Sequence, residues 1–408
     1  MNAPPNSPAH AALEIVKELR AHGHVALLAG GCVRDMLLKR EPKDYDVATD
    51  AHPERVRELF PKARMVGAKF GVVLVRKLRH DVEVATFRTD GTYSDGRRPD
   101  TVTYGTELED ARRRDFTING LFYDPIDDRV IDHVGGRRDL EARVIRTVGD
   151  PERRFSEDHL RMLRAVRFAA QLDFAIDSAT AEAIARLASH LPAISPERIW
   201  MELEGILTSP WPARGWAWLA ELGLRDHLIE GWQISPEAAG RIQERLACLG
   251  APLSPELGLA VLFCGREPAD AEAHCRALRL SNRLTDTTLW LLRSLPILLD
   301  EASLELADLK TLMAGPAWAD LCRLARCEVH DRARLARLLD RAGAIPAHEV
   351  APPPLLSGDE LSALGLTPGP RFGEILKAVY RAQLNNRITT TEQANELALR
   401  LLGGVTEA

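Results

Sequence analysis

The stretch that decides the fold is GGCVRDMLLKREPKDYD, residues 30–46. A short apolar run at 24–28 leads into its glycine pair, which predicts a strand that ends in a turn. Residues 33–39 have helical character, and 44–48 alternate acidic with apolar residues, which predicts a second strand. The stretch therefore predicts a strand, a glycine turn, a helix and a second strand in close succession.

The turn and the second strand carry the first candidate site. A glycine pair (Gly30 and Gly31) lets backbone N–H groups approach a phosphate because no Cβ stands in the way, and Arg34 can add a charge-assisted bond. Residues i and i+2 of a strand share a face, so Asp44 and Asp46 should project together. Two such carboxylates can hold a pair of Mg²⁺ ions, which activate an attacking hydroxyl and stabilise a leaving pyrophosphate. A lone glycine pair or D-x-D is usually structural, but their order and spacing together are specific.

Two further segments add candidate residues. Glu83 lies in an apolar strand segment, 82–87, and could be a third metal-site carboxylate, although the polar face of a half-buried strand explains it as well. In RRDFTING, residues 113–120, Arg114 offers a planar fork for a triphosphate, while Asp115 and Asn119 can bond sugar hydroxyls. A solvated basic turn is the alternative interpretation of that segment.

A helical pattern over 157–168 carries a candidate base reader. Asp158 and Arg161 are i,i+3 neighbours, so they share a helix face. Cytosine and adenine each present an amino donor beside a ring-nitrogen acceptor, whereas uracil and guanine present the reverse order. One Asp acceptor beside one Arg donor therefore matches C and A and leaves unpaired groups against U and G. Arg164 and Arg167 extend the positive charge toward a phosphate chain, while a surface ion pair is the plain alternative.

The rest of the chain predicts an α+β unit followed by helices alone. A helix is predicted at 11–22, and residues 89–110, rich in Gly, Asp and Thr, predict a long loop. After about residue 150, long helical patterns rich in Leu, Ala and Arg take over. The further strands are predicted at 71–76, 82–87, 118–123 and 129–132.

Composition is that of an ordinary globular protein, with 45% hydrophobic and 27% charged residues in 408. A net charge of −6 argues weakly against nucleic-acid binding, but the arginines between 137 and 167 form a local basic footprint for RNA. Six scattered cysteines without a C-x-x-C pair argue against a zinc ribbon and favour a reducing cytosol. Without a signal-peptide pattern or a membrane-length apolar run, the protein is predicted to be cytoplasmic and away from membranes.

Taken in order, the segments at 30–46, 83–100, 113–120 and 157–169 resemble those of class II tRNA nucleotidyltransferases. These are the CCA-adding enzymes, with bacterial poly(A) polymerases as relatives. The resemblance covers roughly residues 24–210. It implies a nucleotidyltransferase-fold head with a mixed sheet, followed by an all-α neck, body and tail that clasp the tRNA acceptor arm. The expected divisions are head 1–150, neck 151–215, body 216–350 and tail 351–408.

The resemblance also implies roles for the candidate residues. Asp44 and Asp46 match the metal carboxylates, with Glu83 as the expected third, and 89–110 matches a flexible loop linked to the switch from C to A addition. Positions that match nucleotide-contacting residues are Gly31, Arg34 and Arg114. Asp115 and Asn119 match residues that contact the sugar. Asp158 and Arg161 match residues that read the base, and Arg164 and Arg167 match residues near the triphosphate.

The resemblance predicts Mg²⁺-dependent addition of C and A, from CTP and ATP, to the 3′ end of tRNA. Three alternatives stay open. An enzyme that adds only A, beside a separate CC-adding partner, has the same motifs. A poly(A) polymerase is disfavoured because 66–71 lacks a basic run. A non-catalytic RNA-binding protein is disfavoured because Asp44, Asp46 and Arg114 are all present. The sequence leaves the oligomeric state open.

Overall fold

The computed structural model describes residues 4–66, 71–93, 99–300, 303–329, 331–363 and 369–403. The chain divides into two compact units, Met1–Ser235 and Pro236–Ala408. Residues 67–70, which bear on the poly(A) polymerase alternative, and 94–98, in the expected flexible loop, lie outside the described residues. The finer division into four parts stays a prediction.

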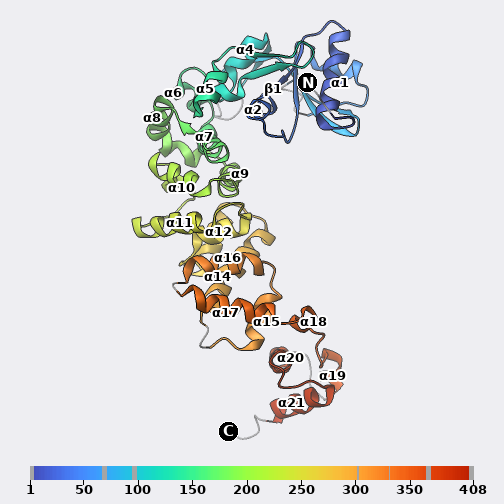
Figure 1. Ribbon diagram of the computed structural model, residues 1–408, viewed down its shortest axis with the longest axis vertical. Helices are drawn as coiled ribbons and strands as arrows, with labels where there is room; N and C mark the ends of the chain where they lie inside the picture. Colours follow the sequence, from blue (N-terminus) through green and yellow to red (C-terminus); the bar gives the residue numbers. More distant parts are fainter. Residues whose placement is uncertain are drawn as a thin grey trace. The chain divides into compact units, whose positions relative to one another are not determined.

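The first unit is built on a seven-stranded sheet with the order β3-β4-β5-β2-β1-β8-β9. Figure 1 shows strand β1 of this sheet between α1 (Pro8–Ala21) and α2 (Gly31–Leu37). The strands are β1 (Ala26–Ala29), β2 (Asp46–Thr49), β3 (Arg64–Met65), β4 (Val72–Lys77), β5 (His80–Thr86), β8 (Leu121–Asp124) and β9 (Arg129–Asp132). Only β2 and β5 pair in parallel, and the other neighbours are antiparallel. The mixed sheet of the expected α+β fold is thereby confirmed.

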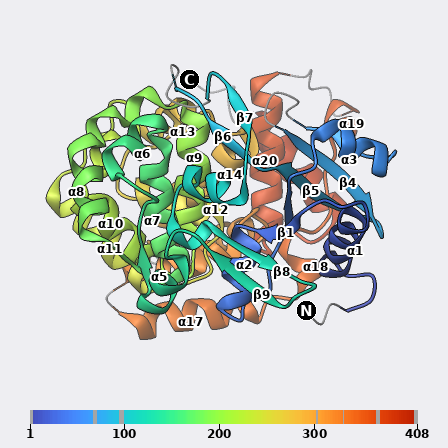
Figure 2. The ribbon, with the colours of Figure 1, turned by 90° about the horizontal axis from the view of Figure 1, so that it is seen from above.

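Helices fix the sheet and place its turns. Helix α1 (Pro8–Ala21) begins at Ser7, whose hydroxyl accepts from the N–H of His10, and buries its apolar side against β1, β2, β4 and β5 (Figure 2). Helix α2 (Gly31–Leu37) follows β1 directly, and α3 (Pro53–Leu59) follows β2. An edge-to-face pair of Phe87 and Phe122 packs in the core beneath these strands.

The predicted loop at 89–110 is wrong in part. It contains the antiparallel pair β6 (Arg88–Asp90) and β7 (Val102–Tyr104) and the start of α4 (Glu107–Arg113). A capping box begins α4, because Thr106 and Glu109 satisfy each other's backbone N–H groups. The Gly and Asp content of the segment concealed this local signal. Two strand starts also shift, since β2 begins at Asp46 and a 3₁₀ turn, η2 (Thr117–Asn119), precedes β8.

The second half of the first unit is mainly helical. The single helix predicted over 157–168 is wrong. Asp158 and His159 separate two helices, α6 (Pro151–Glu157) and α7 (Leu160–Leu172). Its helices are α5 (Gly136–Ala142), α6 (Pro151–Glu157), α7 (Leu160–Leu172), α8 (Ser178–Leu187), η3 (Ala188–Ala193), α9 (Pro196–Leu207), α10 (Pro212–Glu221) and η4 (Arg225–His227). The two-residue strands β10 (Val144–Ile145) and β11 (Ala175–Ile176) pair in parallel, so the expected neck is not purely helical.

The described part of the second unit is helical, as predicted. Helix α12 (Pro255–Phe263) is buried from Leu257 to its last residue and packs against α14 (Asn282–Leu299). The helices are α11 (Pro236–Leu249), α12 (Pro255–Phe263), α13 (Pro268–Ala277), α14 (Asn282–Leu299), α15 (Leu306–Met313), α16 (Trp318–Glu328), α17 (Arg332–Gly343), α18 (Ala347–Val350), α19 (Gly358–Ala363), α20 (Pro370–Leu384) and α21 (Thr391–Gly403). Among the described residues, no helix combines the length and the apolar character that crossing a membrane requires.

A disulfide joins Cys248 on α11 to Cys327 on α16. This pairing runs against the reducing compartment that the cysteine spacing favoured. Spacing excludes a C-x-x-C motif, but it carries no information on two cysteines 79 residues apart that packed helices bring together.

Candidate active site

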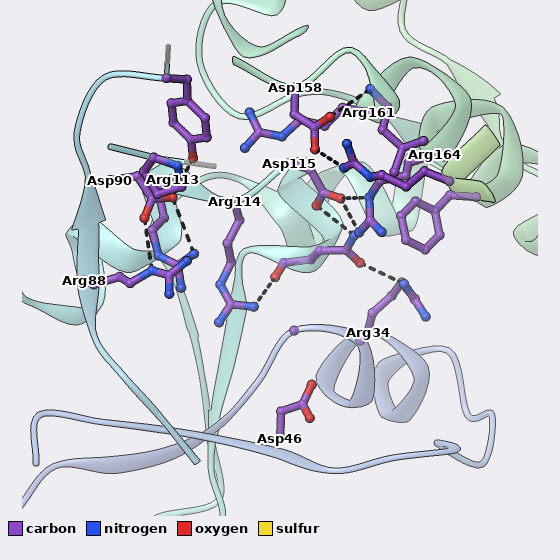
Figure 3. Close-up of a pocket in the computed structure, with 18 residues that line it drawn as sticks. Arg34, Asp46, Arg88, Asp90, Arg113, Arg114, Asp115, Asp158, Arg161 and Arg164 are labelled. Atoms are coloured by element: carbon purple, nitrogen blue, oxygen red, sulfur yellow. Dashed lines mark hydrogen bonds and ion pairs between the residues drawn. The ribbon is translucent and has the colours of Figure 1, made fainter. Parts of the chain in front are cut away.

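A polar cavity of about 700 Å³ opens in the first unit where α2, β2, η2, α7 and α9 meet (Figure 3). It gathers most of the candidate residues from three separate stretches of sequence, 30–46, 113–120 and 157–168. The predicted residues that line it are Gly30, Gly31, Arg34, Asp46, Arg114, Asp115, Asn119, Asp158, Arg161 and Arg164. Lining residues that the sequence did not single out include Arg88, Asp90, Tyr93, Arg113 and Arg198.

The glycine turn lets an arginine lie against the backbone. Gly30 has a φ of 75°, a backbone conformation that residues other than glycine rarely adopt. A Cβ at Gly30 would lie 2.7 Å from Nη1 of Arg114. Glycine is therefore needed here both for the turn and for the space that Arg114 occupies.

A chain of hydrogen bonds crosses the cavity from α2 to α7 (Figure 3). Arg34 Nη1 donates to Asn119 Oδ1 at 2.8 Å, and Asn119 Nδ2 donates to Asp115 Oδ1 at 3.1 Å. Arg164 completes the chain with two bonds to Asp115 Oδ2, at 2.8 and 2.6 Å. Burial alone would raise the pKa of Asp115, but the Arg164 charge and the bonds from Asn119, Arg164 and the Phe116 N–H outweigh it and lower that pKa to about 2.

A second buried carboxylate, Asp110 on α4, holds two arginines that the sequence presented as a basic run. Arg113 donates to its Oδ1 at 2.9 and 2.7 Å, and Arg114 donates to its Oδ2 at 3.1 and 3.0 Å. Arg114 also donates from Nη1 to the Asn119 carbonyl at 3.1 Å. Sequence reasoning missed Asp110, although its position three and four residues before these arginines on one helix was a usable signal.

The acidic residues gather around Asp46, the first residue of β2. Burial, most of all, and then the nearby Glu83 carboxylate raise the pKa of Asp46 to about 6, while Arg114 opposes the shift and Asp44 adds to it. Glu83 lies on β5, the parallel neighbour of β2, and is exposed. Asp44 precedes the strand, so the expected i,i+2 pair within one strand is wrong.

These acids suit a divalent cation that shares its ligands with a substrate. In the part of the chain that the structure describes, no group of three or more His, Cys, Asp or Glu side chains is placed to hold a metal by itself. Mg²⁺ commonly takes one or two carboxylates and completes its shell with water and substrate phosphates. Burial and the acidic neighbours raise the pKa of Asp46, and a nearby cation would stabilise its ionised form.

A second cavity of about 540 Å³ shares Gly31, Arg34, Asp46 and Phe168 with the first. Asp44 and Arg167 line this second cavity instead of the first. The Arg167 side chain donates to Glu202 Oε2 at 2.5 Å and to Gln171 Oε1 at 3.1 Å. The basic residues that line the second cavity are Arg34, Arg40, Lys43 and Arg167. Glu83 is not among the described residues that line either cavity.

The two candidate base readers face the first cavity with separate partners. Asp158 Oδ2 accepts from Arg198 Nη2 at 2.7 Å, and its Oδ1 accepts from the Leu160 N–H at 3.0 Å. Arg161 Nη1 donates to Glu157 Oε2 at 2.6 Å and to the Arg154 carbonyl at 2.8 Å. Two separate ion pairs thus replace the single Asp158–Arg161 pair that the sequence suggested, because Asp158 lies outside the helix that carries Arg161.

Known families match both halves of the first unit. Residues 26–146 match the poly A polymerase head domain, and 173–235 match a family described as a probable RNA and SrmB-binding site of polymerase A. The CCA-adding enzyme of Geobacillus stearothermophilus is 36% identical over 407 residues, which cover 95% of each chain. The CCA-adding enzyme of Lactiplantibacillus plantarum is 34% identical over 394 residues, or 94% of each chain.

This chain belongs to the CCA-adding enzyme family. The crystal structure of the Bacillus stearothermophilus CCA-adding enzyme in complex with CTP is 31% identical to it, with a TM-score of 0.80 and full coverage of both chains. The Thermotoga maritima CCA-adding enzyme complexed with tRNA shares the fold at 22% identity, with a TM-score of 0.69 over 98% of this chain and 96% of that one. The chain is therefore a nucleotidyltransferase, and such enzymes use divalent metal ions.

Proposed function

We propose that this enzyme adds C and A nucleotides to the 3′ end of tRNA, from CTP and ATP and without a nucleic-acid template. The observation that carries the proposal is the 700 Å³ cavity. Asp158 and Arg161 lie at one end of it, Asp46 lies at the other end, and Asp115 lies between them. A nucleoside triphosphate can lie along the cavity with its base at Asp158 and its phosphates toward Asp46. The naming of the relatives as CCA-adding enzymes agrees with this substrate.

The arginines of the cavity bind and orient the triphosphate in this proposal. Arg34, Arg114 and Arg164 are held by Asn119, Asp110 and Asp115, so their remaining N–H groups are fixed before the substrate arrives. Preorganised donors cost little reorganisation in the transition state. Asn119 keeps one N–H and a lone pair for the ribose hydroxyls. The four bonds that Asp115 accepts from Phe116, Asn119 and Arg164 use its lone pairs, so Asp115 would act on the ribose by holding Asn119 in place.

The selection of C and A is assigned to Asp158 and Arg161. The Asp158 carboxylate accepts from the exocyclic amino group of either base, and Arg161 donates to the adjacent ring nitrogen. Uracil would place a carbonyl oxygen against the carboxylate, and guanine would mismatch at both positions. Polar mismatches in a buried site discriminate strongly because they leave desolvated groups unpaired.

Asp44 and Asp46 would hold Mg²⁺ in this proposal, with Glu83 as an outer carboxylate. When bound, the metal supplies a lowered pKa for the attacking hydroxyl and charge stabilisation for the leaving pyrophosphate. The 3′ end of the RNA is placed in the second cavity, because Asp46 is common to both cavities. Arg40, Lys43 and Arg167 give that cavity positive charge for the RNA phosphates.

The domain roles follow the same proposal. Residues 1–150 form the catalytic head and 151–215 the neck with the base-reading segment. Residues 216–350 form the helical body, and 351–408 form a tail that contacts tRNA. In this proposal the enzyme acts in the cytoplasm, where tRNA that lacks its CCA end and both nucleotides are present.

Extension of three tRNA transcripts tests the function directly. The transcripts end before CCA, after C and after CC, and each receives CTP, ATP or both. Completion of all three with both nucleotides supports CCA addition. Extension of the CC-ending transcript alone, by one A, would make the protein an A-adding enzyme, and long A tracts would make it a poly(A) polymerase.

The metal assignment is tested in the same assay with Asp44→Ala. We expect this variant to lose extension, since the carboxylate that helps to hold the metal is gone. Asp286→Ala, which changes an exposed acid on α14, serves as the matched control and should keep wild-type activity. Unchanged extension by Asp44→Ala would remove Asp44 from the metal site.

A further inference from the structure

We propose that Arg198 is a positioning residue for the Asp158 carboxylate and thereby sets part of the discrimination between nucleotides. The inference rests on the proposed function, in which Asp158 reads the incoming base. It adds a residue from a different helix, α9, to a selection step that sequence motifs assign to 157–168 alone. No sequence motif pointed to Arg198.

The contact between the two side chains is direct. Arg198 Nη2 lies 2.7 Å from Asp158 Oδ2, and the Arg198 side chain is 18% exposed and that of Asp158 14% exposed. Both residues line the 700 Å³ cavity. The pair is therefore largely withdrawn from water, where a charge-assisted hydrogen bond has more effect than at an open surface.

The two oxygens of Asp158 have unequal support. The Leu160 N–H holds Oδ1 at 3.0 Å, and Arg198 holds Oδ2. Asp158 itself has an extended backbone between α6 and α7, with φ −154° and ψ 105°, so no helix restricts its side chain. Without Arg198, the Leu160 N–H gives the one remaining hydrogen bond, among the described residues, that opposes rotation about the Cβ–Cγ bond of Asp158.

Arg198 fixes the carboxylate without saturating it. An ionised carboxylate has about four lone-pair directions, and the two bonds described use one on each oxygen. A lone pair therefore stays available for the amino group of C or A. An ionised carboxylate only accepts hydrogen bonds, so a base that offers a carbonyl oxygen at this point is repelled.

Arg198 and Arg161 act on the base through independent supports. Arg161 is held by Glu157 and by the Arg154 carbonyl, both on α6, whereas Arg198 comes from the first turn of α9. Helix α9 packs against α7, and its buried apolar residues include Ile199 and Leu203. Removal of the Arg198 guanidinium should therefore disturb Asp158 and leave Arg161 in place.

The test measures selectivity rather than rate alone. For full-length Arg198→Ala, kcat/KM is determined for CTP and UTP on a transcript that lacks CCA, and for ATP and GTP on a transcript that ends in CC. Loss of one charge-assisted bond predicts that kcat/KM for CTP divided by that for UTP, the C-over-U ratio, falls by about tenfold or more. The same fall is predicted for kcat/KM with ATP divided by that with GTP, the A-over-G ratio. Arg198→Lys keeps one charged donor and should recover part of the ratio.

The matched control is Arg186→Ala. Arg186 also pairs with an acid, Glu152, but its side chain is 57% exposed and it is not among the residues that line the cavity. We expect this variant to keep wild-type selectivity. Thermal unfolding of all three variants, followed by circular dichroism, separates misfolding from a change at the site, and Arg198→Lys carries the test if Arg198→Ala does not fold.

Two outcomes would overturn the inference. Unchanged C-over-U and A-over-G ratios in folded Arg198→Ala, at any overall rate, would show that Arg198 does not position the base reader. Equal losses in Arg198→Ala and Arg186→Ala would point to general charge rather than to Asp158. A wild-type enzyme that does not discriminate at all would instead refute the proposed function.

Discussion

At the scale of single residues, the arginines that line the cavity are already paired with acids before a nucleotide arrives. Asp110 and Asp115 are both buried acids whose pKa is lowered: burial opposes the shift, and adjacent arginines outweigh it. Each acid bonds two side chains, so the arginines lie in fixed directions at the cavity wall. This arrangement favours a site that is formed in advance and needs little rearrangement during the reaction.

The glycine turn provides a prediction at this scale. Gly30→Ala should impair nucleotide binding, because its Cβ would displace Arg114. Gly23→Ala is the matched control, since Gly23 has a φ of 85° but no neighbour within 4 Å of an added Cβ. Both variants should lose about 1–2 kcal/mol of stability from backbone strain. Only Gly30→Ala should raise the KM for CTP, by roughly tenfold, the equivalent of about one lost charge-assisted bond.

Steady-state kinetics and chemical denaturation of both variants decide this prediction. Equal KM values for Gly30→Ala and Gly23→Ala would mean that strain alone matters and that the space filled by Arg114 is irrelevant to nucleotide binding.

The Asp115 carboxyl provides a prediction about acid stability. Its pKa of about 2 lies below the ordinary value of about 3.9, so it stabilises the folded state above pH 4 and loses that contribution as the pH falls toward 2. The shift corresponds to about 2–3 kcal/mol. Asp115→Asn should therefore be less stable than wild type by at least that amount at pH 6, and the difference should shrink below pH 4.

Urea unfolding at several pH values between 3 and 7 measures the difference between the two proteins. A stability gap that stays constant over this range would show that the ionisation of Asp115 does not contribute.

At the scale of elements, the three-residue turn η2 lies at the centre of the hydrogen-bond chain that crosses the cavity. The single turn η2 supplies Asn119, and Asp115 lies just before it. The turn is kept in place by α5, whose first residue, Gly136, approaches so closely that an added Cβ would lie 2.2 Å from the Thr117 carbonyl oxygen. Helix α5 thus positions the cavity residues although none of its own residues is among those that line it.

Gly136→Ala tests this support. The clash is with backbone, which cannot move aside cheaply, so we expect a stability loss of about 1–3 kcal/mol and a higher KM for both nucleotides. Gly240→Ala on α11 is the control, because an added Cβ meets nothing within 4 Å and alanine favours the helix by up to about 1 kcal/mol. The thermal unfolding temperatures of the two variants should therefore change in opposite directions, and only Gly136→Ala should raise the KM. Wild-type stability and KM in Gly136→Ala would contradict the packing seen here.

At the scale of the whole molecule, the described residues form two units that are held together internally by different means. The first unit is organised around the sheet and the polar network at its edge. The second is a series of helices, in which α11 and α16 are joined by the Cys248–Cys327 disulfide and by the ion pair of Arg245 with Glu328. The proposed active site lies in the first unit, so we expect stability and nucleotide addition to respond separately to changes in the second.

The disulfide provides the prediction at this scale. Iodoacetamide should label four cysteines in the unfolded, unreduced protein and six after reduction, because Cys32, Cys264, Cys275 and Cys322 are free. Reduction should also destabilise the second unit by about 2–4 kcal/mol, because it opens a loop closed across 79 residues and so raises the conformational entropy of the unfolded chain. Mass spectrometry and thermal unfolding with and without dithiothreitol check both points. Six labelled cysteines in the unreduced protein would mean that the bond does not form in solution.

How far the sequence predicted the site depended on the distance over which each signal acts. Local spacing predicted the glycine turn, Arg34, Asp46, Arg114 and the base-reading segment, and these residues line one cavity. It also predicted the mixed α+β unit and the helical remainder. Such features depend on neighbours a few residues apart, so periodicity, turn residues and motif order reveal them directly.

Tertiary structure alone decided which groups face one another. It joined Asp158 to Arg198 across 40 residues, Arg164 to Asp115 across 49, and Cys248 to Cys327 across 79. It also moved Asp44 and Arg167 to a second cavity and placed a hairpin where composition suggested a loop. The physical reason is that these contacts arise when separate elements pack together. The residue types at each end are common ones, so nothing in their local sequence distinguishes a paired side chain from a solvated one.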